Sequence, residues 1–421
     1  MAERIYMVID LKSFYASVEC VERGLDPMTT NLVVADPDRT KSTVCLAITP
    51  PMKELGLHSR CRVFQIPEGV HYITAPPRMQ LYIQYAADIY SIYLKYISKE
   101  DIHVYSIDEV FLDVTDYISM YRMDAEQLAR TIMEDILQET GVRATCGIGT
   151  NLYLAKVALD ITAKHSPDFI GFLDETSYQK NLWNHRPLTD FWRVGKGTAT
   201  RLAQYGIYTM KDIAHAKEDF LYQLFGIDAE LLIDHAWGRE PVTMADIKAY
   251  HSKENSIGSG QILPCDYSFA DGRLAVREMM DLLCLDLVEK QLVTSSITLQ
   301  VGYSNGLHLN SARGTAALPT PSNADLMLLP AVTTLYEQIV DPRYPVRRLY
   351  LTCNRVVPEE YHQYSFFVAE EDLTRNRKLQ QTMINIKKRF GKNAILKGMN
   401  LEEHATTRER NQMTGGHRSG T

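Results

Sequence analysis

The feature that most constrains the fold is the order of strands and helices over the first 164 residues. Apolar β-rich runs alternate with stretches of helical spacing, and the predicted order is β, insertion, α, β, β, α, β. The strands are predicted at 5–11, 102–107, 110–114 and 142–148, and the helices at 78–98, 124–139 and 151–164. This is the split βαβ, ferredoxin-like arrangement, with about 65 residues inserted after the first strand. In it, the first strand lies beside the third.

Acidic residues stand where two of these strands come together. Asp10 ends the first strand, and Asp108 and Glu109 lie in the turn between the second and third strands. Oxygen ligands without His or Cys nearby favour magnesium or manganese over zinc. Two such ions support an in-line phosphoryl transfer. Acids in hairpin turns are usually only solvated, but Asp10 on the adjacent strand favours a metal site, and Asp113 is interpreted as structural.

Composition limits the class of protein. A chain of 421 residues, 45% hydrophobic and 23% charged, is typical of a globular protein with several domains. No run of about 18 apolar residues occurs, and Glu3 stands near the start, so we expect no membrane span, no secretory signal and a cytoplasmic location. The seven scattered cysteines predict thiols rather than disulfides or zinc ligands.

The charge distribution is uneven along the chain. The net charge is −7, which alone argues against nucleic-acid binding. From Glu371 onward, however, eleven Lys and Arg face five Asp and Glu, a balance of +6. The polar end from Gly391 onward is predicted to be a frayed tail. Global charge therefore does not exclude a DNA-binding protein.

Several motifs together indicate a family. They are DLKSFYASVE (10–19), SRCRVFQIP (59–67), YSIDEVFLDVT (105–115), GIGTNLYLAKVALDITAK (147–164) and WRVGKGTATRLAQYGIYT (192–209). In this order they resemble the Y-family DNA polymerases over most of the chain. The likeness is to the UmuC-like branch, in the shorter form found in Gram-positive bacteria and their mobile elements.

The resemblance implies a mixed α+β, right-hand-like polymerase with a ferredoxin-like palm, small fingers, a helical thumb and an α/β little finger. The catalytic core would span 1–168, with the palm at 1–12 and 76–168 and the fingers inserted at 13–75. The thumb, with a helix-hairpin-helix, would span 169–240, the little finger 241–357, and a clamp-binding segment and tail 358–421.

The resemblance also assigns roles to the acids. Asp10 and Asp108 are similar to the carboxylates that bridge two Mg²⁺ ions, with Mn²⁺ as a substitute, and the backbone carbonyl of Leu11 would add an oxygen. Glu109 is similar to the acid beside the primer 3′-hydroxyl.

The nucleotide would contact Phe14, Tyr15, Lys53 and Lys164. Tyr15 is similar to the steric gate, a ring that would clash with a ribose 2′-hydroxyl, although by spacing alone it could be a core aromatic. Lys53 and Lys164 would hold the triphosphate, although lone lysines are usually solvated. Pro50 stands where some relatives have a Tyr, so that hydrogen bond is missing here.

DNA and protein partners are expected at two further segments. Over 191–214 we predict a helix, a tight turn and a helix, with Gly195 and Gly197 at the turn letting amides approach a phosphate and Lys196 and Arg201 adding charge. A generic helical hairpin is the alternative. The stretch HQYSFFVAEED (362–372) resembles the peptide by which bacterial polymerases bind the sliding clamp. Its residues would be Gln363, Ser365, Phe366 and Phe367; a final strand of the little finger is the alternative.

The expected function is template-directed, error-prone translesion DNA synthesis from deoxynucleoside triphosphates on primer–template DNA, without proofreading, in SOS-type damage tolerance. A UmuD-like protein or a recombinase filament would be the regulatory partner; the sequence does not decide whether either is needed. A DNA-binding scaffold that lost the chemistry and a two-metal nuclease are the alternatives. The three acids argue against the first, and the gate tyrosine against the second.

Overall fold

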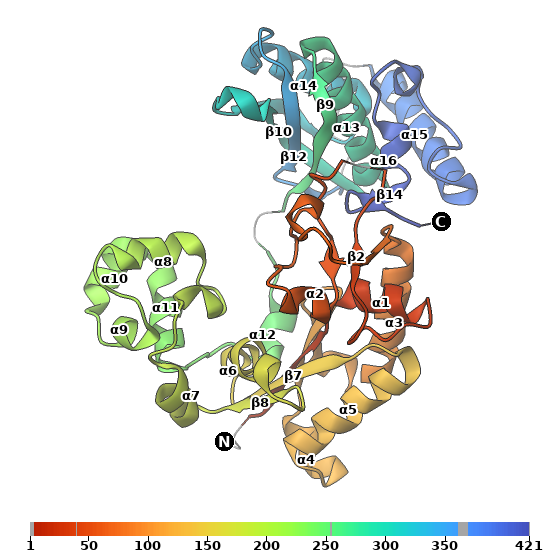
Figure 1. Ribbon diagram of the computed structural model, residues 1–421. Coiled ribbons are helices and arrows are strands. Elements are labelled where there is room, and N and C mark those ends of the chain that lie inside the picture. The colour runs from red at the N-terminus through yellow and green to blue at the C-terminus, as the bar shows by residue number, and fades with distance from the viewer. Residues whose placement is uncertain (1–3, 39, 253–254, 361–368, 421) are drawn as a thin grey trace. The chain divides into compact units, whose positions relative to one another are not determined.

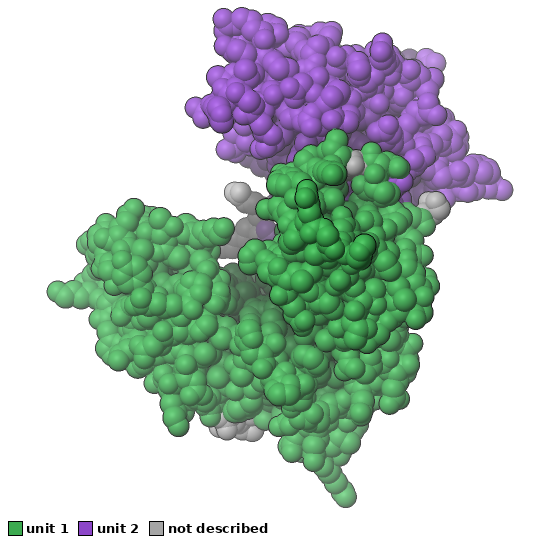
Figure 2. Space-filling model, in the orientation of Figure 1, with its two compact units in different colours: residues 1–250, 420–421 green, residues 251–419 purple. Residues whose placement is uncertain are grey.

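The computed structural model describes residues 4–38, 40–252, 255–360 and 369–420. The chain forms two compact units, one of residues 1–250 with 420–421 and one of residues 251–419 (Figure 2). Within the described residues, no helix is both long and apolar enough to span a membrane.

The first unit is built on a five-stranded sheet. Its order is β5-β6-β1-β7-β8, with β1 between the third and fourth strands of the predicted motif. The strands are β1 (Tyr6–Leu11), β5 (Ile102–Val104), β6 (Glu109–Asp113), β7 (Ala144–Gly149) and β8 (Ile170–Leu173). The ferredoxin-like order is confirmed, and β8, which was not predicted, extends the sheet parallel to β7.

The two faces of this sheet are covered by different helices. Met7 and Ile9 of β1 belong to the core that includes α3 (Met79–Tyr93) and α5 (Ala125–Thr140). The alternate residues of β1, Tyr6 and Val8, pack instead with Leu152, Ala155 and Leu159. Because side chains alternate along a strand, Asp10 belongs to this second face.

The second face is covered by α6 (Leu152–Val157) at very short range. A Cβ on Gly147 would lie 2.2 Å from the backbone oxygen of Ala155, and one on Gly149 would lie 2.3 Å from the Ala155 nitrogen. Only glycine at these two positions of β7 allows the helix backbone to rest on the strand.

The helix predicted over 151–164 has the expected extent but not a uniform type. After α6 it widens into a π turn, η3 (Ala158–Thr162), and ends in a 3₁₀ turn, η4 (Ala163–His165). π turns inside helices are rare and frequent at functional sites.

Two smaller parts complete the first unit. One combines α1 (Phe14–Val21), α2 (Pro50–Glu54), the 3₁₀ turn η1 (Val63–Gln65) and a sheet of β2 (Leu32–Val34), β3 (Ala47–Ile48) and β4 (Ile73–Ala75). The other is helical: α7 (Glu175–Leu182), α8 (Lys196–Ala203), α9 (Met210–Ala214), α10 (Glu218–Phe225) and α11 (Asp228–Trp237) (Figure 1). The first has its own apolar core, whereas the core of the helical part also includes residues of α6 and β8, among them Tyr153, Leu154 and Leu173.

The prediction for residues 191–214 needs a correction. Residues 191–195 form no helix, and the helix before them is the 3₁₀ turn η5 (Leu188–Asp190). Gly195 is the N-cap of α8 and Gly197 lies inside its first turn, so the glycines stand at the start of the helix pair and not at the turn within it. The turn between α8 and α9 contains Gly206 instead.

The second unit is a five-stranded sheet with helices packed on one face (Figure 1), and its short strand β13 (Val357–Pro358) pairs only with β10. Its order is β11-β10-β12-β9, and its elements are β9 (Ile257–Tyr267), α13 (Phe269–Glu289), β10 (Leu292–Tyr303), β11 (Ala312–Ser322), α14 (Asp325–Ile339) and β12 (Val346–Asn354). Strand β11 and helix α14 were not predicted; Pro330 inside α14 obscures its helical pattern.

The frayed tail predicted from Gly391 onward is wrong for the described residues. Helix α15 (Glu370–Phe390) is followed by the 3₁₀ turn η7 (Gly398–Leu401), helix α16 (Thr407–Arg410) and a hairpin of β14 (Met413–Thr414) and β15 (His417–Arg418). Gly415 and Gly416 both have positive φ, as a two-residue hairpin turn of this kind requires.

A buried carboxylate attaches this C-terminal segment to the rest of the second unit. Glu278 on α13 is 1% exposed and accepts hydrogen bonds from the Asn400 side chain at 2.9 Å and from the backbone amides of Thr406 at 2.6 Å and Thr407 at 3.3 Å. The finer division into palm, fingers, thumb and little finger stays a prediction.

Removing this carboxylate should release the segment. We expect Glu278→Ala to destabilise the second unit by about 2–3 kcal/mol, because the buried donors lose their acceptor. Thermal unfolding and limited proteolysis within 391–419 measure the effect. Glu337→Ala is the control, since Glu337 makes only an exposed pair with Arg273 at 2.6 Å. Equal protease resistance of wild type and Glu278→Ala would contradict the anchoring role.

Candidate active site

The pairing of β1 with β6 brings the predicted acids together. Asp10 lies directly opposite Glu109 in the antiparallel register, so the two side chains share a face of the sheet. The backbone amide of Leu11 donates to the Asp108 carbonyl at 2.9 Å, which ties the preceding turn to β1. The convergence predicted from the strand order is confirmed.

The carboxylates nevertheless do not form a closed ligand cluster. Among residues that the structure describes, no three His, Cys, Asp or Glu side chains are grouped so as to hold a metal ion. The Glu109 side chain is occupied elsewhere, because Lys156 Nζ lies 2.9 Å from Oε1 and 3.0 Å from Oε2. The Ser106 hydroxyl donates to Asp108 Oδ1 at 2.5 Å.

Asp10 lies in an environment that favours a cation. Burial raises the pKa of its carboxyl to about 7; Asp108 and Glu109 add to the shift, and Lys164 and Lys156 oppose it. In the described chain the Asp10 carboxylate has no hydrogen bond or ion pair. Asp10 is half-buried, and its desolvated, unpaired carboxylate beside two others is stabilised by a divalent cation; the oxygen-only donor set suits Mg²⁺ or Mn²⁺.

A ladder of alternating charges runs along the helix above the acids. Lys156, 7% exposed, also pairs with Asp160 at 3.0 Å, and Asp160 pairs with Lys164 at 2.8 Å. Burial disfavours the Lys156 charge, but Asp160 and Glu109 outweigh it and raise the pKa of Lys156. Lys156 and Asp160 were not singled out from the sequence, although their i, i+4 spacing with Lys164 was a usable signal.

The two lysines predicted to hold a triphosphate face the same region. Partial desolvation of the ammonium lowers the pKa of Lys53, the Lys164 charge adds to this shift, and the attraction of Asp10 opposes it. Lys53 and Lys164 therefore act on each other and on Asp10 through space, and both side chains remain exposed. Pro50 is the first residue of α2, the position where proline fits a helix.

Tyr15 is held by a second tyrosine that the sequence did not reveal. Its ring stacks on that of Tyr82 with 4.6 Å between centroids, and the Tyr82 hydroxyl donates to buried Glu19 at 2.8 Å. Burial, and to a lesser extent the Asp108 charge, raise the pKa of Tyr15. Phe14, by contrast, is buried in the core, so only its backbone is available to a nucleotide.

The glycines at the start of α8, Gly195 and Gly197, leave its N-terminus open. A Cβ on Gly195 or Gly197 would meet nothing within 4 Å, and α8 has no side-chain cap. Lys196 is exposed, and the Arg201 guanidinium lies 5.5 Å from the centre of the Phe225 ring. The clamp-peptide residues Gln363, Ser365, Phe366 and Phe367 lie outside the described residues.

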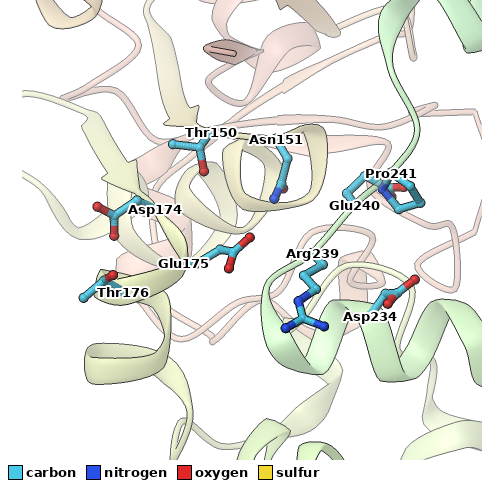
Figure 3. Close-up of a pocket in the computed structure, with 9 residues that line it drawn as sticks. All are labelled: Thr150, Asn151, Asp174, Glu175, Thr176, Asp234, Arg239, Glu240 and Pro241. Carbon is cyan, nitrogen blue, oxygen red and sulfur yellow. The ribbon is translucent and has the colours of Figure 1, made fainter. Parts of the chain in front are cut away.

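An open pocket of about 640 Å³ lies elsewhere in the first unit (Figure 3). It is lined by Thr150, Asn151, Asp174, Glu175, Thr176, Asp234, Arg239, Glu240 and Pro241. Two of its acids already have structural roles, since Asp174 caps α7 and Glu240 pairs with His235 at 3.0 Å. None of the predicted site residues lines it.

Comparison with known proteins gives consistent matches. Residues 9–160 match the impB/mucB/samB family, and residues 254–366 match the C-terminal domain of that family. The chain is 30% identical to the putative UV-damage repair protein UvrX of Bacillus subtilis, over 98% of this chain and 97% of the relative. It is 28% identical to DNA polymerase IV 2 of Halalkalibacterium halodurans, over 99% of both chains.

A solved structure matches the fold. The Y-family DNA polymerase chimera Dbh-Dpo4(243-245)-Dbh aligns with a TM-score of 0.65 at 22% identity, covering 84% of this chain and 99% of the other. At this identity the likeness concerns the fold alone, and it confirms the mixed α+β architecture.

Because the Asp10 carboxyl is desolvated, we expect the free energy of unfolding of the metal-free protein to depend on pH. Its folded pKa of about 7 exceeds the ordinary 3.8, so the folded state binds more protons between these values and stability falls as pH rises through that window. We expect Asp10→Asn to be more stable than wild type in EDTA at pH 8, by up to a few kcal/mol, with the gain shrinking towards pH 4.

Thermal unfolding across this pH range measures the effect. Asp113→Asn is the control on the same face, because Asp113 accepts a hydrogen bond from Thr115 at 2.6 Å and should give no such gain. A pH-independent difference between Asp10→Asn and wild type would refute the desolvated, unpaired state of the Asp10 carboxyl.

Proposed function

The chain belongs to the impB/mucB/samB family of Y-family DNA polymerases and is a DNA-directed DNA polymerase, and on this basis we propose that it carries out error-prone synthesis across damaged template positions. Support for the damage-related role comes from the relative named a putative UV-damage repair protein. Placement in the UmuC-like branch and a role in SOS mutagenesis belong to the proposal; the relatives described above are named UvrX and DNA polymerase IV.

The observation on which the chemistry rests is the register of Asp10 opposite Glu109, with Asp108 beside them. We assign Asp10, Asp108 and the Leu11 carbonyl as the ligands of two Mg²⁺ ions, and Glu109 as the acid next to the primer end. When bound, the metals supply charge neutralisation for attack of a primer 3′-hydroxyl on a deoxynucleoside triphosphate. The protein contributes a rigid strand pair that fixes the acids before substrate arrives.

The nucleotide is held from two sides in this proposal. Lys53 and Lys164, whose charges act on Asp10, attract the triphosphate towards the acids. Tyr15 presents its ring to the sugar, and the stack on Tyr82 restricts its retreat. A ring that cannot move aside discriminates against an added hydroxyl by steric clash.

Duplex DNA is assigned to the α8 N-terminus. Backbone amides at a helix N-terminus bind phosphate, and the open space around Gly195 and Gly197 lets a DNA backbone approach closely. Lys196 and Arg201 add positive charge. Such contacts fix the position of a duplex without reading its sequence, as a polymerase requires.

The low fidelity in this proposal follows from the small size of the part of the protein that would close over a newly formed base pair. The part built on β2, β3 and β4 has a small apolar core and offers a limited surface for closing over a base pair. Residues 370–419 belong to the second unit and number about half of the roughly 100 residues of a typical separate domain, so we propose that these residues provide no proofreading.

Residues 363–367 are proposed to bind the bacterial sliding clamp, with Phe366 and Phe367 as anchors. A pull-down with purified clamp, comparing wild type with both phenylalanines changed to Ala, tests this assignment. Dependence on a UmuD-like protein or a recombinase filament is tested by adding each to the same synthesis assay.

Primer extension tests the proposed function. With Mg²⁺ and four deoxynucleotides, we expect extension of a primer across an abasic or UV-damaged position, and a loss of at least 100-fold in rate for Asp108→Asn. Wild type that copies undamaged template but always stops at lesions would refute lesion bypass. Degradation of the primer would favour a nuclease.

Sugar selection tests Tyr15. Tyr15→Ala should raise ribonucleotide incorporation by about 100-fold or more, because the clash with the 2′-hydroxyl is removed, and leave deoxynucleotide addition within about tenfold. Single-nucleotide insertion kinetics with matched ribo- and deoxynucleotides provide the measurement. Tyr82→Phe keeps the stacking ring and should retain selectivity. Unchanged selectivity in Tyr15→Ala would remove the gate assignment.

A further inference from the structure

A buried lysine connects two groups to which separate roles were assigned above. Lys156 contacts both oxygens of Glu109, at 2.9 and 3.0 Å, and also pairs with Asp160. Asp160 in turn holds Lys164 at 2.8 Å. The acid assigned to the primer end and the lysine assigned to the triphosphate are therefore linked through two intervening side chains.

The helix geometry keeps this ladder on one face. Positions four apart in an α-helix drift by about 40° per step, so Lys156, Asp160 and Lys164 would separate along a regular helix. The π turn of η3 falls between the first and the last of them, and its wider winding reduces the drift. The departure from α-helix thus coincides with the stretch where three charged side chains must stay in line.

The position of Lys156 relative to the acids is fixed by backbone contact. Gly147 and Gly149 let the helix rest directly on β7, which is the neighbour of β1 in the sheet. Leu152 and Ala155 of α6 pack with Val8 of β1 and Phe111 of β6, which brings the helix over the strand pair that contains Asp10 and Glu109.

From these contacts we infer that Lys156 is a positioning residue, which orients the Glu109 carboxylate towards the primer end and, through Asp160, places Lys164 for the incoming triphosphate. The inference rests on the metal and nucleotide roles proposed above. It assigns Lys156 no contact with substrate.

The competing explanation is a purely structural ion pair. Buried pairs can often be replaced by apolar residues without loss of stability, whereas removal of one partner leaves a charge uncompensated. A structural role alone would change stability and leave the metal dependence and nucleotide affinity of the folded molecules as they were. The two explanations can therefore be separated by measuring the insertion rate, the Mg²⁺ dependence and the nucleotide affinity of the folded fraction.

The test uses the full chain with Lys156→Met, Lys156→Arg and Asp160→Asn. Lys95→Met is the matched control, because Lys95 also bridges two carboxylates, Asp135 at 3.2 Å and Glu139, but outside the site. Thermal unfolding gives the folded fraction. Single-turnover insertion against Mg²⁺ concentration reports on Glu109. Equilibrium binding of a matched deoxynucleotide to enzyme on a dideoxy-terminated primer, where no chemistry occurs, reports on Lys164.

We expect Lys156→Met to lower the insertion rate by about 100-fold, since misplacing a group by an ångström has an effect of that size, and to raise the half-saturating Mg²⁺ concentration several-fold. Lys156→Arg should recover part of the rate. Asp160→Asn should weaken deoxynucleotide binding about tenfold on the dideoxy primer, equivalent to about 1.4 kcal/mol, with Mg²⁺ dependence near wild type.

Folded Lys156→Met with wild-type rate and Mg²⁺ dependence, or losses no larger than those of Lys95→Met, would overturn the inference. So would unchanged nucleotide affinity in Asp160→Asn, a variant that also decides the matter if Lys156→Met fails to fold. Failure of the proposed function is separate, because it would show as wild type that bypasses no lesion while still inserting nucleotides on undamaged DNA.

Discussion

The antiparallel pairing of β1 with β6 is the constraint on which the site depends. It sets Asp10 opposite Glu109, although the two residues are far apart in sequence, and it turns both towards the face covered by α6. A shift of register by one residue would move Asp10 to the opposite face, into the apolar core with Met7 and Ile9. The buried alternation of β1 makes that shift very unfavourable, so the sheet core and the chemistry are specified by the same residues.

The charged groups of the site differ in how their charges are balanced. The protein buries negative charge at Asp10 and balances only part of it with lysines, so a cation has a favourable place to bind. Glu109 and Asp160 take their counter-charge from Lys156 instead. The acids are thus not equivalent in their surroundings, which is consistent with the different roles proposed for them.

Much of the fold was predictable because its signals are local or topological. The order of strands in the palm-like sheet followed from hydrophobic periodicity and from the rule that places the first strand beside the third. β8 and α14 escaped prediction, the second because Pro330 interrupts its pattern. The ordered C-terminal segment was missed because its anchors are polar contacts to Glu278, whereas polar sequence suggests exposure.

The candidate site, too, was predicted only in part from the sequence. The three acids followed from strand ends, but Lys156 and Tyr82 matter through contacts that only the packed structure reveals. The direction of the Glu109 side chain could not be inferred from its position in a turn. The position of a residue at a strand end predicts which side chains come close together, but it does not predict the ion pair or hydrogen bond that each side chain makes.

The two glycines of β7 give the site an unusual kind of mutational sensitivity. Helix and strand touch through main-chain atoms, so the spacing between them has no adjustable side chain to absorb a change. A single methyl group at residue 147 or 149 would act as a wedge, lifting Lys156 and Lys164 together away from the acids. Positions with no functional atoms of their own would then behave in genetic selection like members of the catalytic machinery.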